Sequence, residues 1–333
     1  MAPTVFFRVD AGLEIGSGHV MRSLALAEAL RLAGARVCWI MRTRPGDLRR
    51  RVESKGFEVR SLPPATNAAP DAAPAAVPPA SQGAARREHE RWLGVPWQED
   101  ALETRRALGA GGAGAIRPDL LVVDHYGIDA RWESSLRPHV GRLCVIDDLG
   151  DRAHDCDLLV APAAGLGPSH LRRLVPEYCT ILTGASYALI ASEFAEKRTA
   201  AIARRRARPG GVARIFVGFG GVDRAGLTRA SLKALLRVRF EGELDVVLGE
   251  EAPHREEVRS FLDEHFQNAR LHVAPASIAP LMAEADLAIG AAGVMSWERC
   301  AVGLPAVVVC AAANQARVAR ALAVVGAAAV VAH

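Results

Sequence analysis

The sequence has little lysine and little net charge. Its 333 residues include 41 Lys and Arg against 37 Asp and Glu, which gives a formal net charge of only +4 at pH 7. The lysines are Lys55, Lys197 and Lys233, and basic and acidic residues alternate except at residues 204–208. Nucleic-acid-binding proteins carry clustered basic patches, so we expect no nucleic-acid partner and interpret 204–208 as a solvated helix end or a linker.

Paired cysteines and a long apolar run are also missing. None of the six cysteines forms a C-x-x-C pair and most lie within apolar runs, which is typical of reduced core thiols in a cytosolic protein. The first residues hold no basic segment followed by an apolar stretch, as a signal peptide would. The apolar C-terminal part is interrupted by polar residues at Asn314, Gln315, Arg317 and Arg320. We therefore expect a cytoplasmic protein with no membrane partner.

Two common catalytic signatures are absent. The sequence contains no Walker A motif and no G-x-S-x-G elbow, which argues against a P-loop nucleotide site and a serine hydrolase. Residues 147–157 are rich in hard metal ligands, namely Asp147, Asp148, Asp151, His154, Asp155 and Asp157. A metal site there is one alternative. We interpret these residues instead as loop caps and ion-pair partners, and we predict neither a metal nor a cofactor.

The residues that are present alternate between short apolar runs and helical patterns over the whole chain. This rhythm predicts α/β structure with doubly wound parallel sheets, and the length is sufficient for two domains. A helical segment followed by the linker 207–211 predicts domains at 1–206 and 207–333. An Ala- and Pro-rich stretch within 62–95 cannot bury much apolar surface, so we predict a mobile insertion there.

The most informative stretch lies near the N-terminus. An apolar run ends at Asp10, a glycine-rich loop with Gly16 and Gly18 follows, and a helical pattern begins at His19. The spacing places His19 and Arg22 on one face of the first helical turn. A helix N-terminus favours anions and a neutral imidazole, so the pattern predicts a phosphate site with His19 as a base. A tight turn without a ligand is the alternative.

Two further glycine turns follow predicted strands in the second half. The first contains Gly220 and Gly221, and Asp223 and Thr228 after it can cap the next helix. The second, within residues 289–300, contains Gly293, Ser296 and Glu298. Backbone N–H groups suit a diphosphate and a carboxylate suits ribose hydroxyls, so these turns predict a nucleoside diphosphate site. Packing turns without a ligand are the alternative here too.

Several longer segments together resemble the PseG family, the UDP-2,4-diacetamido-2,4,6-trideoxy-β-L-altropyranose hydrolases of pseudaminic acid biosynthesis, related to the MurG-like glycosyltransferases. They span positions 10 to 315 and read DAGLEIGSGHVMRSLALA, WLGVPWQEDALET, VVDHYGIDARWE, VIDDLGDRAHDCDLL, GFGGVD and GAAGVMSWERCAVGLP, followed by NQ. The resemblance implies a GT-B fold, with two Rossmann-like domains facing a cleft and UDP held mainly by the C-terminal one. It also implies metal-independent, inverting attack of water at the anomeric carbon of a UDP-sugar.

The resemblance assigns roles to individual residues. It implies that His19 and Asn314 are catalytic. With the glycine turns, it predicts substrate contacts at Asp10, Gly16, Gly18, Arg22, Tyr126, Gly220, Gly221, Gly293, Ser296, Glu298 and Gln315. Where the family reads D-Q-N, this chain has Val160-Ala161-Pro162. A GT-B glycosyltransferase and a catalytically degenerate nucleotide-sugar-binding protein therefore stay as alternatives. We expect a UDP-sugar as the partner and a monomer or weak dimer.

Overall fold

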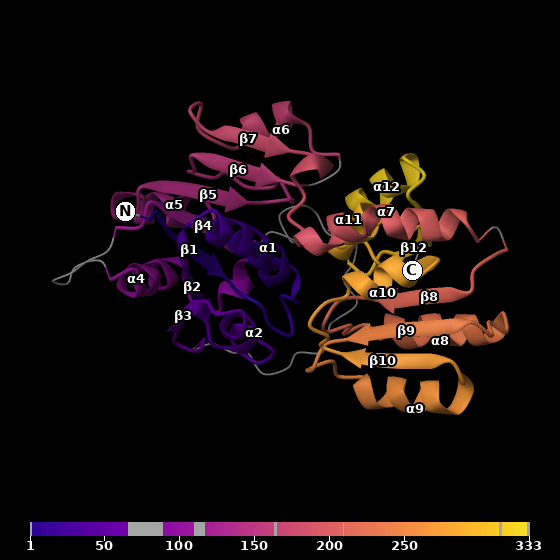
Figure 1. Ribbon diagram of the computed structural model, residues 1–333. Helices are drawn as coiled ribbons and strands as arrows, with labels where there is room; N and C mark the ends of the chain where they lie inside the picture. The colour runs from indigo at the N-terminus through magenta and orange to yellow at the C-terminus, as the bar shows by residue number, and fades with distance from the viewer. Residues whose placement is uncertain are drawn as a thin grey trace. The chain divides into compact units, whose positions relative to one another are not determined.

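The chain folds into two α/β units, each built on a parallel sheet (Figure 1). The computed structural model describes residues 2–65, 89–109, 117–162, 165–208, 210–312 and 315–331. The first unit comprises residues 1–15 and 19–189, and the second comprises residues 16–18 and 190–333. The predicted α/β class with doubly wound parallel sheets is confirmed.

The first unit holds a seven-stranded sheet in the order β3-β2-β1-β4-β5-β6-β7. Its strands are β1 (Thr4–Val9), β2 (Arg36–Arg42), β3 (Glu58–Leu62), β4 (Leu120–Asp124), β5 (Arg142–Ile146), β6 (Leu158–Ala161) and β7 (Thr180–Thr183). Strand β1 pairs with both β2 and β4, and Val9 lies opposite Asp124. Successive strands are added in one direction from β1 to β3 and in the other from β4 to β7, so the order changes between β1 and β4. Doubly wound folds bind their ligands at such a position.

Successive side chains of a strand point to opposite faces of this sheet, and each face carries an apolar core. On one face, Val5 and Phe7 of β1 pack with α1 (Gly18–Leu32) and α2 (Arg49–Ser54). On the other face, Phe6 packs with α4 (Trp97–Ala107), α5 (Ala130–Leu136) and α6 (Pro168–Arg172). Three short 3₁₀ helices, η1 (Arg91–Leu93), η2 (Arg137–His139) and η3 (Ala185–Tyr187), complete the unit.

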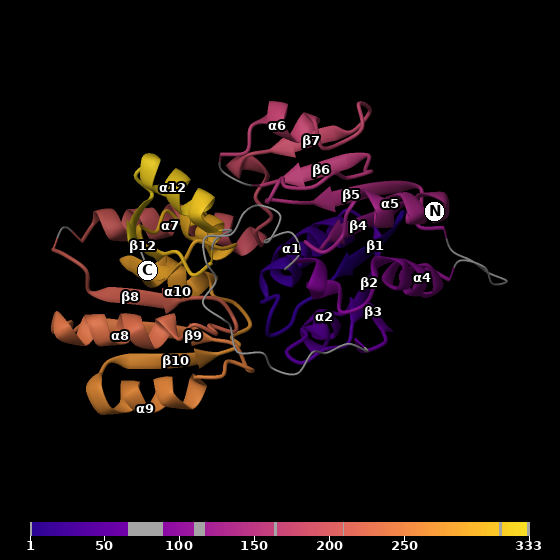
Figure 2. The same ribbon diagram turned by 180° about the vertical axis from the view of Figure 1, so that it is seen from behind.

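The second unit repeats this plan with six strands in the order β10-β9-β8-β11-β12-β13. They are β8 (Arg214–Gly218), β9 (Glu243–Leu248), β10 (Ala269–Val273), β11 (Leu287–Ala291), β12 (Ala306–Val309) and β13 (Ala328–Val331). One face carries α8 (Leu227–Arg237) and α9 (Arg255–His265), and the other carries α7 (Ser192–Arg206), α10 (Ala279–Glu284), α11 (Met295–Ala301) and α12 (Ala316–Val324). Figure 2 shows the same layers from behind.

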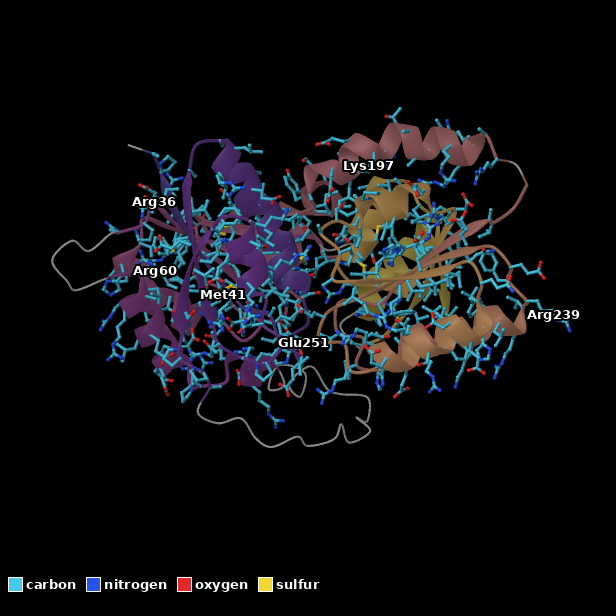
Figure 3. The ribbon with its side chains drawn as sticks, turned by 60° about the horizontal axis from the view of Figure 1, so that its bottom comes forward. Arg36, Met41, Arg60, Lys197, Arg239 and Glu251 are labelled. Carbon is cyan, nitrogen blue, oxygen red and sulfur yellow. The ribbon has the colours of Figure 1, made fainter. Side chains whose placement is uncertain are left out.

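Helix α7 belongs to the second unit, so the boundary predicted after residue 206 is wrong and lies at 189–190. Phe194 and Ala201 are buried in the same core as α10 and β12. Arg204 and Arg205 each donate to the carbonyl of Ala285, at 2.7 and 2.9 Å, and so satisfy the C-terminus of α10. The basic run is a helix end, as predicted, but it caps a neighbouring helix. Lys197 lies on the same helix (Figure 3).

The predicted insertion at 62–95 is too wide. Leu62 is the last residue of β3, and Leu93 and Val95 are buried. Residues 66–88 of that prediction lie outside the described part of the chain. All six cysteines are free thiols, and four of them are buried. In the ranges that the structure describes, no helix has both the length and the apolar character needed to span a bilayer.

Candidate functional site

The glycine-rich loop before α1 presents His19 to a buried carboxylate. His19 lies in the first turn of α1, and Asp124 is the last residue of the adjacent strand β4. The two groups meet with Nδ1 2.6 Å from Asp124 Oδ1. An ionised carboxylate only accepts hydrogen bonds, so Nδ1 carries the proton and donates it. Within the described residues, Nε2 has no hydrogen-bond partner, which leaves its lone pair available.

Asp124 is held as an anion by its surroundings. It is fully buried and accepts two hydrogen bonds from Arg22, at 2.8 and 2.6 Å, and one from Ser23 at 2.9 Å. Burial alone would raise the pKa of this carboxyl, but the Arg22 guanidinium and His19 outweigh it and hold the pKa well below its usual range. A permanently charged Asp124 therefore fixes both the tautomer and the orientation of His19.

Arg22 links this pair to Tyr126. Its Nη1 donates to Asp148 at 2.9 Å, and Asp148 accepts the Tyr126 hydroxyl at 2.5 Å. Burial and the Asp148 carboxylate raise the pKa of Tyr126 well above its usual value, so the hydroxyl stays protonated and donates. The edge of the Tyr126 ring packs on His19 with 4.3 Å between ring centroids. The structure thus brings three predicted residues, His19, Arg22 and Tyr126, into one cluster.

Asp10 lies behind this cluster. It is fully buried, accepts from Arg8 at 2.7 and 3.0 Å, and accepts from the backbone N–H of Arg42 at 2.7 Å. The pKa of Asp10 lies well below its usual range because Arg8 and Arg44 outweigh the opposing effect of burial. These partners indicate that Asp10 positions the start of the glycine loop, and its substrate contact stays a prediction. Gly16 in the loop adopts a left-handed φ of 80°, and Gly18 begins α1.

The sequence alone gave Asp124 and Trp92 no role at this site, and it predicted Asp148 only as a loop cap or ion-pair partner. Asp124 and Asp148 follow neighbouring strands, β4 and β5, whose ends meet at one edge of the sheet. Polar residues at the carboxyl ends of adjacent parallel strands were the signal that could have found them. Trp92 fell inside the segment predicted to be an insertion. Its ring stacks on Tyr126 at 5.7 Å between centroids and an interplanar angle of 24°.

The first glycine turn of the second unit is tightly built. Gly220 has a φ of 100°, and the carbonyl of Gly221 accepts from the N–H of Gly249 at 2.8 Å. Asp223 accepts from the N–H groups of Leu227 and Thr228, at 3.0 and 2.8 Å, and so satisfies the start of α8, whereas the Thr228 hydroxyl has no partner among the described residues. This capping occupies the carboxylate. The turn therefore offers a ligand its backbone rather than the side chain of Asp223.

The second turn leaves polar atoms without partners. Gly293 precedes α11, and Ser296 accepts a hydrogen bond from Arg299 at 2.9 Å. Glu298 is buried, and its Oε2 has no hydrogen-bond partner among the described residues. Burial, with a smaller effect of Glu193, raises the pKa of Glu298 to about 7. A buried carboxyl group without a partner is costly, so it is suited to receiving hydroxyl groups of a ligand.

The remaining predicted residues, Asn314 and Gln315, follow β12 in the sequence. Gln315 precedes α12 and accepts from the N–H of Ala311 at 3.0 Å, so its side chain closes the turn after the strand. Asn314, predicted to be catalytic, lies outside the described residues. In the described ranges no group of three or more His, Cys, Asp or Glu side chains is placed to hold a metal. Several acids of 147–157 form ion pairs, as predicted, with Arg137 and Arg152.

Two known proteins are similar to the chain in sequence. It is 28% identical over 168 residues to a UDP-2,4-diacetamido-2,4,6-trideoxy-β-L-altropyranose hydrolase of Campylobacter jejuni, which covers 50% of this chain and 57% of that protein. It is 22% identical over 303 residues to an uncharacterised protein of Methanocaldococcus jannaschii, covering 90% of this chain and 54% of that protein. The chain thus spans little more than half the length of these relatives. No family model matches it.

Solved structures define the class of fold. MurG of Acinetobacter baumannii matches 100% of this chain and 86% of its own, with a TM-score of 0.55 and 17% identity. UGT89C1 of Arabidopsis thaliana, solved with UDP-L-rhamnose, gives a TM-score of 0.62 at 12% identity over 100% of this chain and 86% of its own. A UDP-glucosyltransferase of Polygonum tinctorium gives 0.64 at 14% identity over 99% and 85%. The chain therefore has the GT-B fold of these glycosyltransferases.

Proposed function

We propose that this protein is a UDP-sugar hydrolase that acts on a UDP-2,4-diacetamido-2,4,6-trideoxyhexose, as the Campylobacter relative's name describes for that protein. The observation that carries the proposal is the His19–Asp124 pair, with 2.6 Å between Nδ1 and Oδ1 and with no partner for Nε2 in the part of the chain that the structure describes. This arrangement provides an oriented general base. The partial match to a hydrolase supplies the substrate class.

The proposed step is an inverting displacement. A water molecule donates a proton to Nε2 of His19 while its oxygen forms a bond to the anomeric carbon of the sugar. The bond between that carbon and the oxygen of the β-phosphate breaks, and UDP leaves with the electron pair. UDP is a good leaving group, so the main demands on the protein are a positioned water and stabilisation of the diphosphate.

We further propose that the second unit binds the UDP. Its glycine turns offer backbone N–H groups to phosphates, and the unpartnered Oε2 of Glu298 suits ribose hydroxyls. Asn314 and Gln315 follow β12 and remain candidates for polar contacts with the sugar. These assignments give the first unit the base and the second unit the nucleotide.

A GT-B glycosyltransferase is the second candidate, favoured by the solved structures of the same fold. In that reaction His19 would take its proton from an acceptor hydroxyl rather than from water. The pair of His19 and Asp124 serves both reactions equally, because the same atom accepts the proton. Only the identity of the nucleophile separates the two.

Hydrolysis in ¹⁸O-labelled water tests the proposal. The purified chain is incubated with the UDP-diacetamido-trideoxyhexose and no acceptor, and products are analysed by mass spectrometry. We expect UDP release with one ¹⁸O in the C1 hydroxyl of the sugar and none in UDP. Label in a phosphate, or release only when an acceptor is added, would contradict it. Binding of UDP by calorimetry without any release would identify a nucleotide-sugar-binding protein instead.

A further inference from the structure

The ring of Trp92 lies beside the proposed base. It stacks on Tyr126 with 5.7 Å between centroids, and its plane lies nearly perpendicular to the His19 ring, at 82° with 6.2 Å between centroids. Trp92 is only partly buried, whereas His19 is nearly inaccessible. Trp92 and Tyr126 therefore form an aromatic wall beside the imidazole of His19, whose Nε2 has no partner among the described residues.

The backbone that carries Trp92 is firmly held. Arg44 donates to the carbonyl of Trp92 at 2.8 Å and to the carboxylate of Asp10, the residue after β1, at 3.3 Å. One guanidinium therefore connects η1 to the start of the glycine-rich loop. The next residue, Leu93, is buried in the core of the first unit. Gly94 then turns the chain with a left-handed φ of 74°. A ring fixed in this way needs little ordering when a ligand arrives.

The chemistry of the wall matches one part of a sugar. Aromatic faces bury apolar surface and attract the partly positive hydrogens of C–H groups. Each face of a deoxyhexose has such C–H groups, and a 6-deoxy sugar adds a methyl group. The Tyr126 hydroxyl is already engaged with Asp148, so its ring contributes a face rather than a free polar group. Neither ring can take the place of the base.

We propose that Trp92, backed by Tyr126, is the hexose-stacking and specificity-determining residue of this site. It binds a C–H-rich face of the sugar beside His19. This inference rests on the proposed function, because it assumes that the ligand beside His19 is a nucleotide-linked hexose. It assigns a role to a residue that sequence reasoning placed in an insertion.

The chain offers a matched control in Trp97. This tryptophan follows in the same segment and is also partly buried, but it packs against the apolar core and stands 5.7 Å from the Arg131 guanidinium. The aromatic contacts described for His19 and Tyr126 do not include it. Replacement of either tryptophan by phenylalanine alters one ring at a comparable depth.

Steady-state kinetics of Trp92→Ala, Trp92→Phe and Trp97→Phe test the role. We expect Trp92→Ala to raise KM about 10-fold while kcat changes by less than about threefold. Stacking on the sugar stabilises the bound substrate and the transition state equally, so its loss weakens binding without slowing the chemical step. Trp92→Phe should recover most of the affinity, and Trp97→Phe should match the wild type. An unchanged KM in Trp92→Ala, or an equal rise in Trp97→Phe, would overturn the proposal.

Tryptophan fluorescence gives a readout that does not depend on turnover. We expect the UDP-sugar to quench the wild type and Trp97→Phe, to leave Trp92→Phe largely unquenched, and UDP alone to quench little. If the wild type binds the UDP-sugar and quenches but releases no UDP, the hydrolase proposal fails and the Trp92 subsite stands. If quenching is absent in the wild type or survives in Trp92→Phe, the subsite is wrong whatever the activity.

Discussion

Two histidine–carboxylate pairs in the first unit have nearly the same geometry and different surroundings. His19 contacts Asp124 at 2.6 Å and His154 contacts Glu133 at 2.7 Å, in each case through Nδ1. The second nitrogen of His154 faces Asp147 at 3.5 Å, so that ring lies between two carboxylates. Despite burial, Glu133 and Asp147 raise the pKa of His154 to about 9. His154 is therefore a structural cation at neutral pH, while His19 keeps one nitrogen for chemistry.

A third histidine completes the comparison. His125 is buried between Arg8, Arg44 and Asp10, and burial together with the two arginines lowers its pKa to about 3. Its Nδ1 accepts from the N–H of Gly127 at 3.0 Å. His125 is thus neutral and His154 charged at pH 7, and neither is placed to exchange a proton with a ligand. The Nε2 atoms of His125 and His154 each face a carboxylate at 3.5 Å, whereas Nε2 of His19 faces none among the described residues.

Replacing Asp124 should have the largest effect on the first pair. In Asp124→Asn the Arg22 guanidinium loses a fully buried counter-charge, and one amide oxygen replaces the two carboxylate oxygens that accept from His19 and Arg22. We expect a loss of about 3–5 kcal/mol in the free energy of unfolding, because removing one partner strands a buried charge. Urea denaturation measures it. A loss below about 1 kcal/mol would show that Asp124 does not organise the cluster.

Replacing His154 should separate structure from catalysis. The pKa of this group is raised from 6.5 to about 9 in the folded protein, so its stabilisation is complete below pH 6.5 and is lost as the pH rises through about 9. We expect His154→Gln to be less stable than the wild type by up to about 3 kcal/mol at pH 6, with the gap closing by pH 10. Denaturation at several pH values checks this. A constant gap would argue against the charged state.

Replacing Glu298 tests the second unit. Its pKa is raised from 4.5 to about 7, so the fold favours the neutral form, and that preference is lost as the pH rises through about 7. If the carboxylate accepts ribose hydroxyls, UDP should bind the wild type more tightly at pH 8 than at pH 6. We expect Glu298→Gln to bind about 10-fold more weakly at pH 8, with little pH dependence. Calorimetry with UDP measures both affinities. Equal affinities of the wild type and Glu298→Gln at pH 8 would show that Glu298 does not contact the nucleotide.

Replacing Asp148 should have the smallest effect. Asp148 accepts from both Arg22 and Tyr126, and an amide in its place can accept through one oxygen only. We expect Asp148→Asn to lower kcat about 10-fold through a looser Arg22, with KM little changed. The matched control is Asp151→Asn, since Asp151 pairs with Arg152 rather than with Arg22. A change in kcat that is equal in both variants would count against a specific role for Asp148.

The sequence predicted the strands and the glycine turns well because alternation and glycine spacing are local signals. The apolar run predicted to end at Asp10 is β1, which ends at Val9, and the helix predicted to begin at His19 is α1, which begins at Gly18. Asp124 could not be paired with His19 in the same way, because the two lie 105 positions apart and meet only through the β1–β4 pairing. Helix α7 was assigned to the wrong unit because its apolar side alone does not reveal which sheet it covers.

The turnover of His19→Asn tests the central claim most directly. Asparagine keeps a donor for Asp124 but has no basic nitrogen, so folding should be nearly preserved while proton transfer is lost. With saturating UDP-sugar, we expect kcat to fall by about 10²–10⁴, because His19 is the proposed general base. His154→Gln, measured beside it at pH 7, should keep a kcat near that of the wild type. If His19→Asn releases UDP as fast as the wild type, His19 is not the base.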